Sequence, residues 1–174
     1  KVVDETVIEA RVRAACENTV KRAITYETPE LIELAADAMK RHIPGEADCF
    51  KSKSELQYAL RQHQLEKISD QVNYYTKKCL KGDPAGLNQL ALDLDKYAGD
   101  DSTSIALALV IAEKATKEKE ATSDCYSTYA YLTLKAKGKD EAVKILDDAL
   151  LKFTDPQSKD NQQLTALRNR FQNM

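Results

Sequence analysis

The sequence predicts an all-α chain of about eight helices, and three observations support that fold class. Glycine and proline are scarce, with five and four copies in 174 residues, although each β-hairpin would need turn-forming residues of its own. Most of these residues fall between segments in which apolar side chains recur every three or four positions, as they do in helices that bury one face. Hydrophobic residues make up 43% of the chain and charged residues 31%, which is typical of a folded globular protein.

Three helices are predicted in the first half of the chain. Thr28 and Pro29 have the pattern of an N-cap residue followed by proline at the first helical position. Pro44 and Gly45 together predict a helix end, so segment 43–52 is expected to be the longest loop. The expected helices cover about residues 4–26, 29–42 and 53–81.

The third of these helices carries a change of phase in its apolar pattern. From Leu65 onward the apolar residues follow at spacings of 3, 4, 3 and 4, which is typical of a helix packed against another helix. This pattern is out of phase with the apolar residues up to Leu60. A kink or break is therefore predicted between Leu60 and Leu65.

Five further helices are predicted in the second half of the chain. Asp83 and Pro84 repeat the pattern of an N-cap followed by proline. Gly99 and Gly138 predict helix ends, because glycine readily adopts the left-handed conformation found there, and Pro156 closes another segment. The expected helices cover about residues 84–98, 103–118, 123–137, 140–153 and 158–172.

One internal repeat is visible in the second half. Residues 108–115 align with residues 142–149 at an offset of 34 positions. Alanine stands at both ends of each segment, and apolar residues match between them. Small residues seven positions apart on a helix let a neighbouring helix approach closely on that side.

These residues resemble the tetratricopeptide repeat, a helix–turn–helix unit of about 34 residues. Ala130, Ala142 and Ala149, spaced by 12 and 7 positions, stand where that family has its small residues. Three positions depart from the family pattern. Thr133 replaces the usual aromatic residue, Gly138 comes one position late, and Pro156 comes two positions late.

The resemblance implies an α-α superhelix, or solenoid, with degenerate tetratricopeptide-like units in the C-terminal half. It covers residues 103–156 well, and residues 83–99 look like the first helix of an earlier unit. Residues 83–174 are accordingly expected to form the repeat region with a C-terminal capping helix. Residues 1–82 do not match the pattern and are expected to be divergent helices that pack on the repeat within one continuous α-helical domain. The alternative is an unrelated helical bundle.

The last expected helix has two interpretations. Leu164, Leu167 and Phe171 lie among polar residues, as in the terminal helix of a repeat array, which needs a polar outer side. We interpret this helix as a cap. The alternative is that the same three residues form a contact with another copy of the chain.

A second resemblance concerns the wider context of the chain. Segments 128–132 and 138–142, together with the divergent helices before them, are similar to the helical C-terminal region of thioredoxin-like proteins of Bacteroidetes-type bacteria. This resemblance implies a thioredoxin domain upstream of Lys1 and a location in the bacterial periplasm; without it, the cytoplasm is the expected location. A chain that begins with Lys1 rather than Met is expected to be a processed product or a fragment.

The repeat resemblance also implies a function, namely a non-catalytic module for protein–protein interaction or scaffolding. The first helices of such units line a concave face that holds an extended peptide or a partner helix. Tyr131 is the kind of amphipathic side chain that dominates interfaces. The candidate partner-binding residues are Asp124, Ser127, Tyr131, Leu134 and Lys135. The alternative for Tyr131 and Leu134 is that they pack against the helix expected at 84–98 or are covered by the first half of the chain.

The second functional hypothesis is a helical ligand carrier or enzyme. Its pocket would lie between the N-terminal helices and the repeat. Tyrosines from both halves are the candidates to line that pocket, because each offers an apolar ring and a polar tip. They are Tyr58, Tyr74, Tyr75 and Tyr97.

Several kinds of site are not expected. Lys and Arg total 26 against 28 Asp and Glu, and the net charge of −2 argues against nucleic-acid binding through a general basic field. The sequence contains no phosphate-binding loop, nucleophile elbow or dinucleotide motif, so no catalytic residue and no cofactor is expected. His42 and His63 lack ligand-spaced partners, so no metal is expected. The longest apolar run, at 105–112, is too short for a membrane helix, so no membrane insertion is expected.

The four cysteines are Cys16, Cys49, Cys79 and Cys125, and none belongs to a CxxC motif. Their simplest interpretation is as small buried apolar residues. A disulfide is possible, but the spacing does not indicate which cysteines would pair. The cysteines therefore do not indicate the redox compartment. The sequence also does not identify the partner or the oligomeric state.

Overall fold

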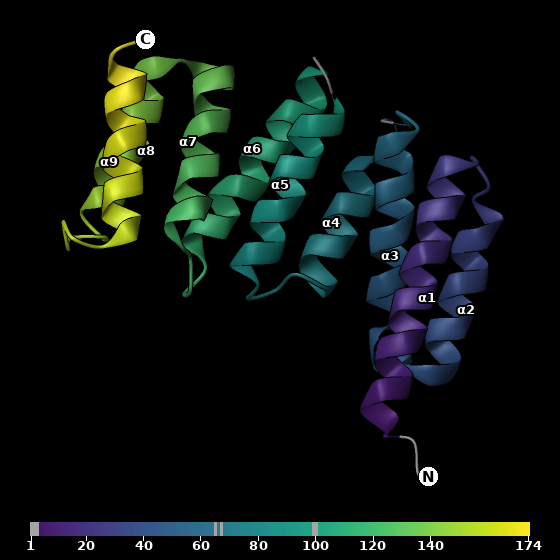
Figure 1. Cartoon of the computed structure of the whole chain (residues 1–174). Helices are drawn as coiled ribbons and strands as arrows, with labels where there is room; N and C mark the ends of the chain where they lie inside the picture. Colours follow the sequence, from purple (N-terminus) through teal and green to yellow (C-terminus); the bar gives the residue numbers. More distant parts are fainter. Residues whose placement is uncertain (1–3, 65, 67, 99–100) are drawn as a thin grey trace. The chain divides into compact units, whose positions relative to one another are not determined.

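The chain is helical throughout the part that the structure describes. The computed structural model describes residues 4–64, 66, 68–98 and 101–174, and these contain nine α-helices and no strand (Figure 1). The all-α prediction is confirmed. None of the described helices is both long enough and apolar enough to cross a membrane, as expected. The helices are α1 (Glu5–Thr25), α2 (Glu30–His42), α3 (Pro44–Arg61), α4 (Ile68–Lys78), α5 (Pro84–Ala98), α6 (Ser102–Lys117), α7 (Ser123–Lys137), α8 (Lys139–Leu150) and α9 (Lys159–Gln172).

Two compact units make up the chain, Lys1–Cys79 and Leu80–Met174. The N-terminal unit contains α1 to α4, and the C-terminal unit contains α5 to α9. Each unit has a buried apolar cluster of its own, which includes Met39 in the first and Leu146 in the second.

In the N-terminal unit, α1, α2 and α3 pack against one another, and α4 packs against α3. Apolar residues three or four positions apart on each helix form the shared core. Cys16 and Val20 of α1 lie in one cluster with Ala35 and Met39 of α2 and Ala47 of α3. The apolar stripes expected for the first two helices therefore meet in one place.

Two ion pairs tie α3 to the other two helices. Arg13 of α1 lies 2.8 Å from Glu46, and this contact raises the pKa of Arg13 and lowers that of Glu46. Lys51 of α3 lies 2.7 Å from Glu33 of α2, and the hydrogen bond raises the pKa of Lys51. All four side chains are exposed to solvent, so these pairs orient the helices more than they stabilise them.

The loop predicted at 43–52 is wrong, because α3 begins at Pro44. Ile43 alone links α2 to α3, and its N–H donates to the Met39 carbonyl at 2.6 Å. Proline has no N–H, and the first N–H groups of a helix have no intrahelical acceptor, so Pro44 starts the helix without losing a hydrogen bond. Gly45 lies inside this first turn instead of ending the preceding helix.

The break predicted after Leu60 is confirmed, so the single helix expected over 53–81 is two helices. α3 ends at Arg61 and α4 begins at Ile68. Between them His63 adopts a left-handed conformation with φ of +52°, which turns the chain. Leu65, from which the second phase is counted, lies outside the described residues.

A disulfide joins Cys49 of α3 to Cys79, directly after α4, with the two Cα atoms 5.6 Å apart. The cysteines are 30 positions apart in sequence. A disulfide that closes a loop of that length stabilises the folded chain by about 3–4 kcal/mol, because it removes conformational entropy from the unfolded chain. Cys16 and Cys125 are free and buried, as small apolar residues would be, and burial raises the pKa of the Cys16 thiol.

In the C-terminal unit, each helix packs against the next one in sequence, and α7 also contacts α5 and α9. Ala130, Ala142 and Ala149 are all fully buried and belong to one apolar cluster. Leu146 of α8 and Leu164 of α9 lie in the same cluster and are also fully buried. Because alanine is small, the helices can approach closely where these residues meet.

Carboxylate side chains cap the start of two helices in this unit. Asp83 accepts a hydrogen bond from the Gly86 N–H at 2.9 Å, so the predicted N-cap at Asp83 is confirmed. Asp101 accepts from the Ser104 N–H at 2.7 Å, and its hydrogen bonds to Ser104 lower the pKa of Asp101. Gly99, the predicted end of the preceding helix, lies outside the described residues.

Gly138 is the single residue between α7 and α8. Its φ of +100° and ψ of −178° lie in a region that side chains with a Cβ rarely adopt. Its N–H donates to the carbonyls of Thr133 and Leu134, at 3.2 Å each. The helix end predicted at Gly138 is confirmed.

The last helix, α9, packs against α8 and α7. Leu164 and Phe171 are buried in the core of the unit, and Leu167 packs against that core. The burial of Leu164 and Phe171 is incompatible with a contact between copies through these two residues. Arg168 of α9 also forms an ion pair with Asp147 of α8.

Replacing Ala130 with leucine should destabilise the C-terminal unit. Ala130 is fully buried between helices, and overpacking at such a position costs about 1–3 kcal/mol. Ala136→Leu is the matched control, because Ala136 lies on the same helix and is exposed. Thermal unfolding followed by circular dichroism should give a lower midpoint for Ala130→Leu alone. Equal midpoints for the two variants would contradict close packing at Ala130.

Replacing Gly138 with alanine should destabilise the chain by about 1–3 kcal/mol, because alanine would be strained at a φ of +100°. Gly45→Ala is the control, since a Cβ at Gly45 meets open space in the first turn of a helix. That control should be neutral or stabilising by up to about 1 kcal/mol. Urea denaturation measures both, and a Gly138→Ala variant as stable as the parent would contradict the observed backbone conformation.

Candidate functional site

The five candidate partner-binding residues lie on α7, and we call them the α7 face. Asp124, Tyr131 and Lys135 are exposed, whereas Ser127 and Leu134 are half-buried. Leu134 packs against the C-terminal apolar cluster, so it lies at the edge of the core and not on the open surface. The open part of the α7 face is therefore polar at both ends and aromatic in the middle.

The helical period explains why these residues share one side of α7. Positions 124, 131 and 135 are spaced by seven and four, which places their side chains in one row along a helix. Ala130 and Leu132, the neighbours of Tyr131 in sequence, are fully buried on other sides of the helix. Tyr131 itself remains 43% exposed.

Lys135 links the α7 face to α5. Its Nζ lies 2.5 Å from Oδ1 of Asp95, whose side chain is only 14% exposed. The same Nζ lies 5.7 Å from the centroid of the Tyr131 ring, within the range of a cation–π contact. Asp95 therefore holds Lys135, and Lys135 in turn helps to orient the Tyr131 ring.

Gln163 links the other end of the α7 face to α9. Its Nε2 donates to Oδ1 of Asp124 at 2.8 Å and lies 3.4 Å from Oγ of Ser127. The three helices α5, α7 and α9 are thus joined by polar side chains along this side of the unit. Tyr131 lies between the two sets of contacts.

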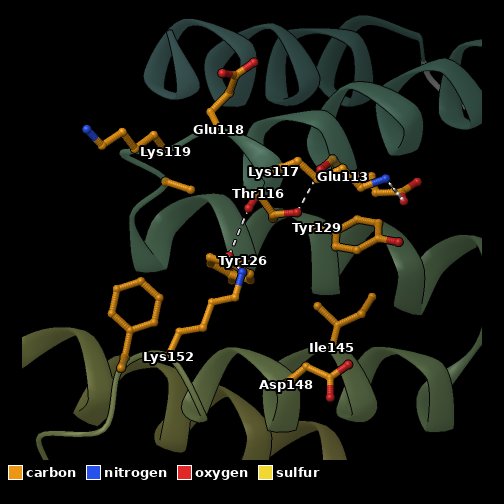
Figure 2. Close-up of a pocket in the computed structure, with 12 residues that line it drawn as sticks. Glu113, Thr116, Lys117, Glu118, Lys119, Tyr126, Tyr129, Ile145, Asp148 and Lys152 are labelled. Atoms are coloured by element: carbon orange, nitrogen blue, oxygen red, sulfur yellow. Dashed lines mark hydrogen bonds and ion pairs between the residues drawn. The ribbon is translucent and has the colours of Figure 1, made fainter. Parts of the chain in front are cut away.

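A cavity of about 630 Å³ opens elsewhere in the same unit, where α6, α7 and α8 meet (Figure 2). Glu118 and Lys119, in the turn after α6, lie on one side of it, and Asp148 of α8 lies on the other. Tyr126 and Lys152 lie between them. Charges of both signs therefore border an opening that also has aromatic walls.

Tyr126 is the most strongly fixed residue of this cavity. It is only 7% exposed, its hydroxyl donates to the Thr116 carbonyl at 2.9 Å, and it accepts from Nζ of Lys152 at 2.6 Å. Its ring also makes an edge-on contact with Phe153, with the centroids 5.7 Å apart. Lys152 lies near the hydroxyl end of the ring, because its Nζ contacts the hydroxyl and is 5.0 Å from the ring centroid. These contacts make the Tyr126 hydroxyl a structural link between α6, α7 and the segment after α8.

Tyr129 and the Glu113–Lys117 pair form a second part of the cavity wall. Burial raises the pKa of Tyr129, and the Glu113 carboxylate adds to that shift. Lys117 lies 2.6 Å from Glu113, and this hydrogen bond raises the pKa of Lys117. At neutral pH the wall thus presents a neutral phenol beside an ion pair.

The four tyrosines of the second hypothesis are divided between the two units. Tyr74 lines a cavity of about 470 Å³ formed by α3 and α4, within the N-terminal unit. Tyr58 and Tyr75 are half-buried in the same unit, whereas Tyr97 is half-buried on α5 of the other unit. Within the described residues, no group of three or more His, Cys, Asp or Glu side chains is arranged to hold a metal ion.

The sequence did not indicate the cavity beside Tyr126. Its walls come from three helices and two turns, so its residues share no spacing that a linear pattern could reveal. One local signal exists, since Tyr126 and Tyr129 are three positions apart and line the same cavity. The five residues of the α7 face could be grouped from the sequence because they lie on one helix.

Replacing Tyr126 with phenylalanine should destabilise the C-terminal unit by about 1–3 kcal/mol, because the buried Thr116 carbonyl would lose its donor. Tyr131→Phe is the matched control, since the Tyr131 side chain is much more exposed and the change should stay within about 0.5 kcal/mol. Thermal or urea unfolding of both variants measures the difference. A Tyr126→Phe variant as stable as the control would contradict the structural role of this hydroxyl.

The chain matches no protein-family model, and no significant similarity to a curated protein or a solved structure is found. The resemblances to tetratricopeptide repeats and to thioredoxin-like proteins are therefore proposals.

Proposed function

We propose that the chain is a non-catalytic protein-interaction module and that the α7 face binds a partner protein or peptide. On this proposal α5 to α9 form a tetratricopeptide-like array. The pattern of helix contacts supports this arrangement, since α5, α7 and α9 contact one another in order while α6 and α8 each pack between successive members of that set. The first helices of the units would then be α5, α7 and α9.

The observation that carries the proposal is the state of Tyr131. A large aromatic side chain is 43% exposed, yet it is already oriented through Lys135 and Asp95. An ordered aromatic side chain loses little conformational freedom on binding, and tyrosine is among the residues that most often dominate interfaces. The α7 face therefore combines exposure with preorganisation.

The remaining α7 face residues favour a partner segment of mixed character. Asp124 and Lys135 carry opposite charges, so the face does not favour a strongly acidic or strongly basic partner. Leu92 of α5 is 37% exposed and lies three positions before Asp95, the partner of Lys135, so it offers apolar surface near that end of the α7 face. An extended peptide with one apolar anchor and flanking polar groups suits these side chains.

The disulfide supports one part of the proposed context. Disulfides persist mainly in oxidising compartments, such as the bacterial periplasm and the extracellular space. A role as the accessory region of a thioredoxin-like protein is compatible with such a compartment. The accessory role concerns the whole protein, and partner binding by the α7 face does not depend on it.

The Tyr131→Ala/Lys135→Ala variant should lose its partner without losing its fold. The full chain is used as bait in extracts of its source organism, and captured proteins are quantified by mass spectrometry. We expect recovery of the partner to fall by at least about tenfold, which corresponds to roughly 1.4 kcal/mol at a hot spot.

Leu151→Ala is the matched control, because Leu151 belongs to the same unit and is 78% exposed, away from the α7 face. It should capture the partner as the parent does. Circular dichroism should be the same for all three proteins. Equal recovery by the double variant, the control and the parent would overturn the proposal.

A further inference from the structure

The Cys49–Cys79 disulfide holds the end of the shortest helix in the described part of the chain. Cys49 lies in α3, and Cys79 follows α4 directly. Both cysteines are half-buried, whereas the free thiols of Cys16 and Cys125 are buried. We propose that this disulfide is a reducible latch, opened by a dithiol, which releases α4 from α3.

Helix α4 depends on outside support. It has 11 residues, and isolated helices shorter than about 12–15 residues are marginal in water. Ile68, Val72 and Thr76 are buried and recur every four positions, and Cys79 follows three positions later on the same side. The buried side of α4 and the disulfide therefore act together to hold this helix.

An open groove runs along the contact between α3 and α4. This groove has a volume of about 470 Å³ and is lined by Ser52 and other residues of α3 and by Gln71 and Tyr74 of α4. The Oε1 atom of Gln71 is buried and has no hydrogen-bond partner among the described residues. A buried acceptor without a donor weakens the adhesion of α4.

The charged side chains along this contact are mostly acidic. Asp70 of α4 lines the groove together with Asp48 and Glu55 of α3. Lys51 is the basic residue of the lining, and it pairs with Glu33 at 2.7 Å and lies 3.8 Å from Glu55. Neither of these ion pairs of Lys51 therefore joins α4 to α3.

The rest of the N-terminal unit does not depend on the latch. The shared core of α1, α2 and α3 includes Cys16, Met39 and Ala47, and neither cysteine of the disulfide belongs to it. The ion pair between Arg13 and Glu46 also joins α1 to α3 directly. Opening the disulfide is therefore expected to free α4 while α1 to α3 stay packed.

The chemistry is thiol–disulfide exchange with a dithiol as the reductant. One thiolate of the dithiol attacks a sulfur of the Cys49–Cys79 bond, that bond breaks, and the other cysteine leaves as a thiolate that takes a proton from water. The second thiol of the reductant, as its thiolate, then attacks the reductant's own sulfur in the mixed disulfide, and the remaining cysteine leaves as a thiolate that takes a proton from water. The products are one oxidised dithiol and two cysteine thiols, so two electrons pass to the chain.

Opening the latch would uncover an apolar surface. Leu56 and Leu60 follow Cys49 by seven and eleven positions, so they lie on the same side of α3 as the disulfide, and both are buried. Ile68 and Val72 are buried on α4. The oxidised chain hides these residues, and the reduced chain would present part of them to a partner.

Hydrogen exchange of the full chain, with and without dithiothreitol, tests the latch. We expect the amides of residues 68–78 to exchange roughly 100- to 700-fold faster after reduction, which corresponds to the chain entropy that a crosslink of this loop length removes. Exchange in α1 to α3 and in the C-terminal unit should stay within about twofold. Maleimide labelling under the same native conditions should add two modified cysteines, Cys49 and Cys79.

The Cys49→Ser/Cys79→Ser variant is the matched control. It should show fast exchange at 68–78 without reductant and no further change with it. Four free thiols in the purified chain, resistance of the disulfide to reduction under native conditions, or unchanged protection of 68–78 after reduction would each overturn the proposal. Faster exchange across all of α1 to α4 would also overturn it, since it would mean global unfolding of the unit. If the double variant fails to fold, the reduced parent chain still decides the result.

Discussion

Close approach between helices at small residues is the constraint on which the C-terminal unit depends. Ala130, Ala142 and Ala149 are fully buried in one cluster with Leu146 and Leu164, so two helices supply the small residues and their neighbours fill the remaining space. Packing of this kind is sensitive to volume because interiors have few voids. The position of α7 between α5, α8 and α9 follows from it, and so does the direction in which the α7 face points.

One helix therefore serves both the core and the candidate interaction surface. In α7, Ala130 is buried and Tyr131 is exposed, although they are adjacent in sequence. The buried side fixes the backbone, and polar links from Lys135 to Asp95 and from Gln163 to Asp124 fix the exposed side. A binding surface built on a packed helix in this way is more precisely placed than one built on a loop.

The two units are stabilised by different means. The C-terminal unit relies on small-residue packing and on the buried hydroxyl of Tyr126, which bonds to Thr116 and Lys152. The N-terminal unit adds a covalent bond, the Cys49–Cys79 disulfide, beside its short last helix. A crosslink stabilises mainly by restricting the unfolded chain, so it supplements the short contact surface that α4 offers.

The sequence by itself determined the features that depend on neighbouring positions along the chain. Helical period predicted seven of the nine described helices to within a few residues, and the other two as a single helix with a break after Leu60. The cap at Asp83 and the turn at Gly138 were also predicted, because each is encoded within one or two helical turns. Helical period also grouped the α7 face, whose five residues lie on one helix. Only the tertiary structure decided whether Pro44 ends one helix or begins the next, which cysteines pair, and where the cavity beside Tyr126 lies. These features join residues that are distant in sequence or depend on where neighbouring helices pack, and no local spacing carries that information.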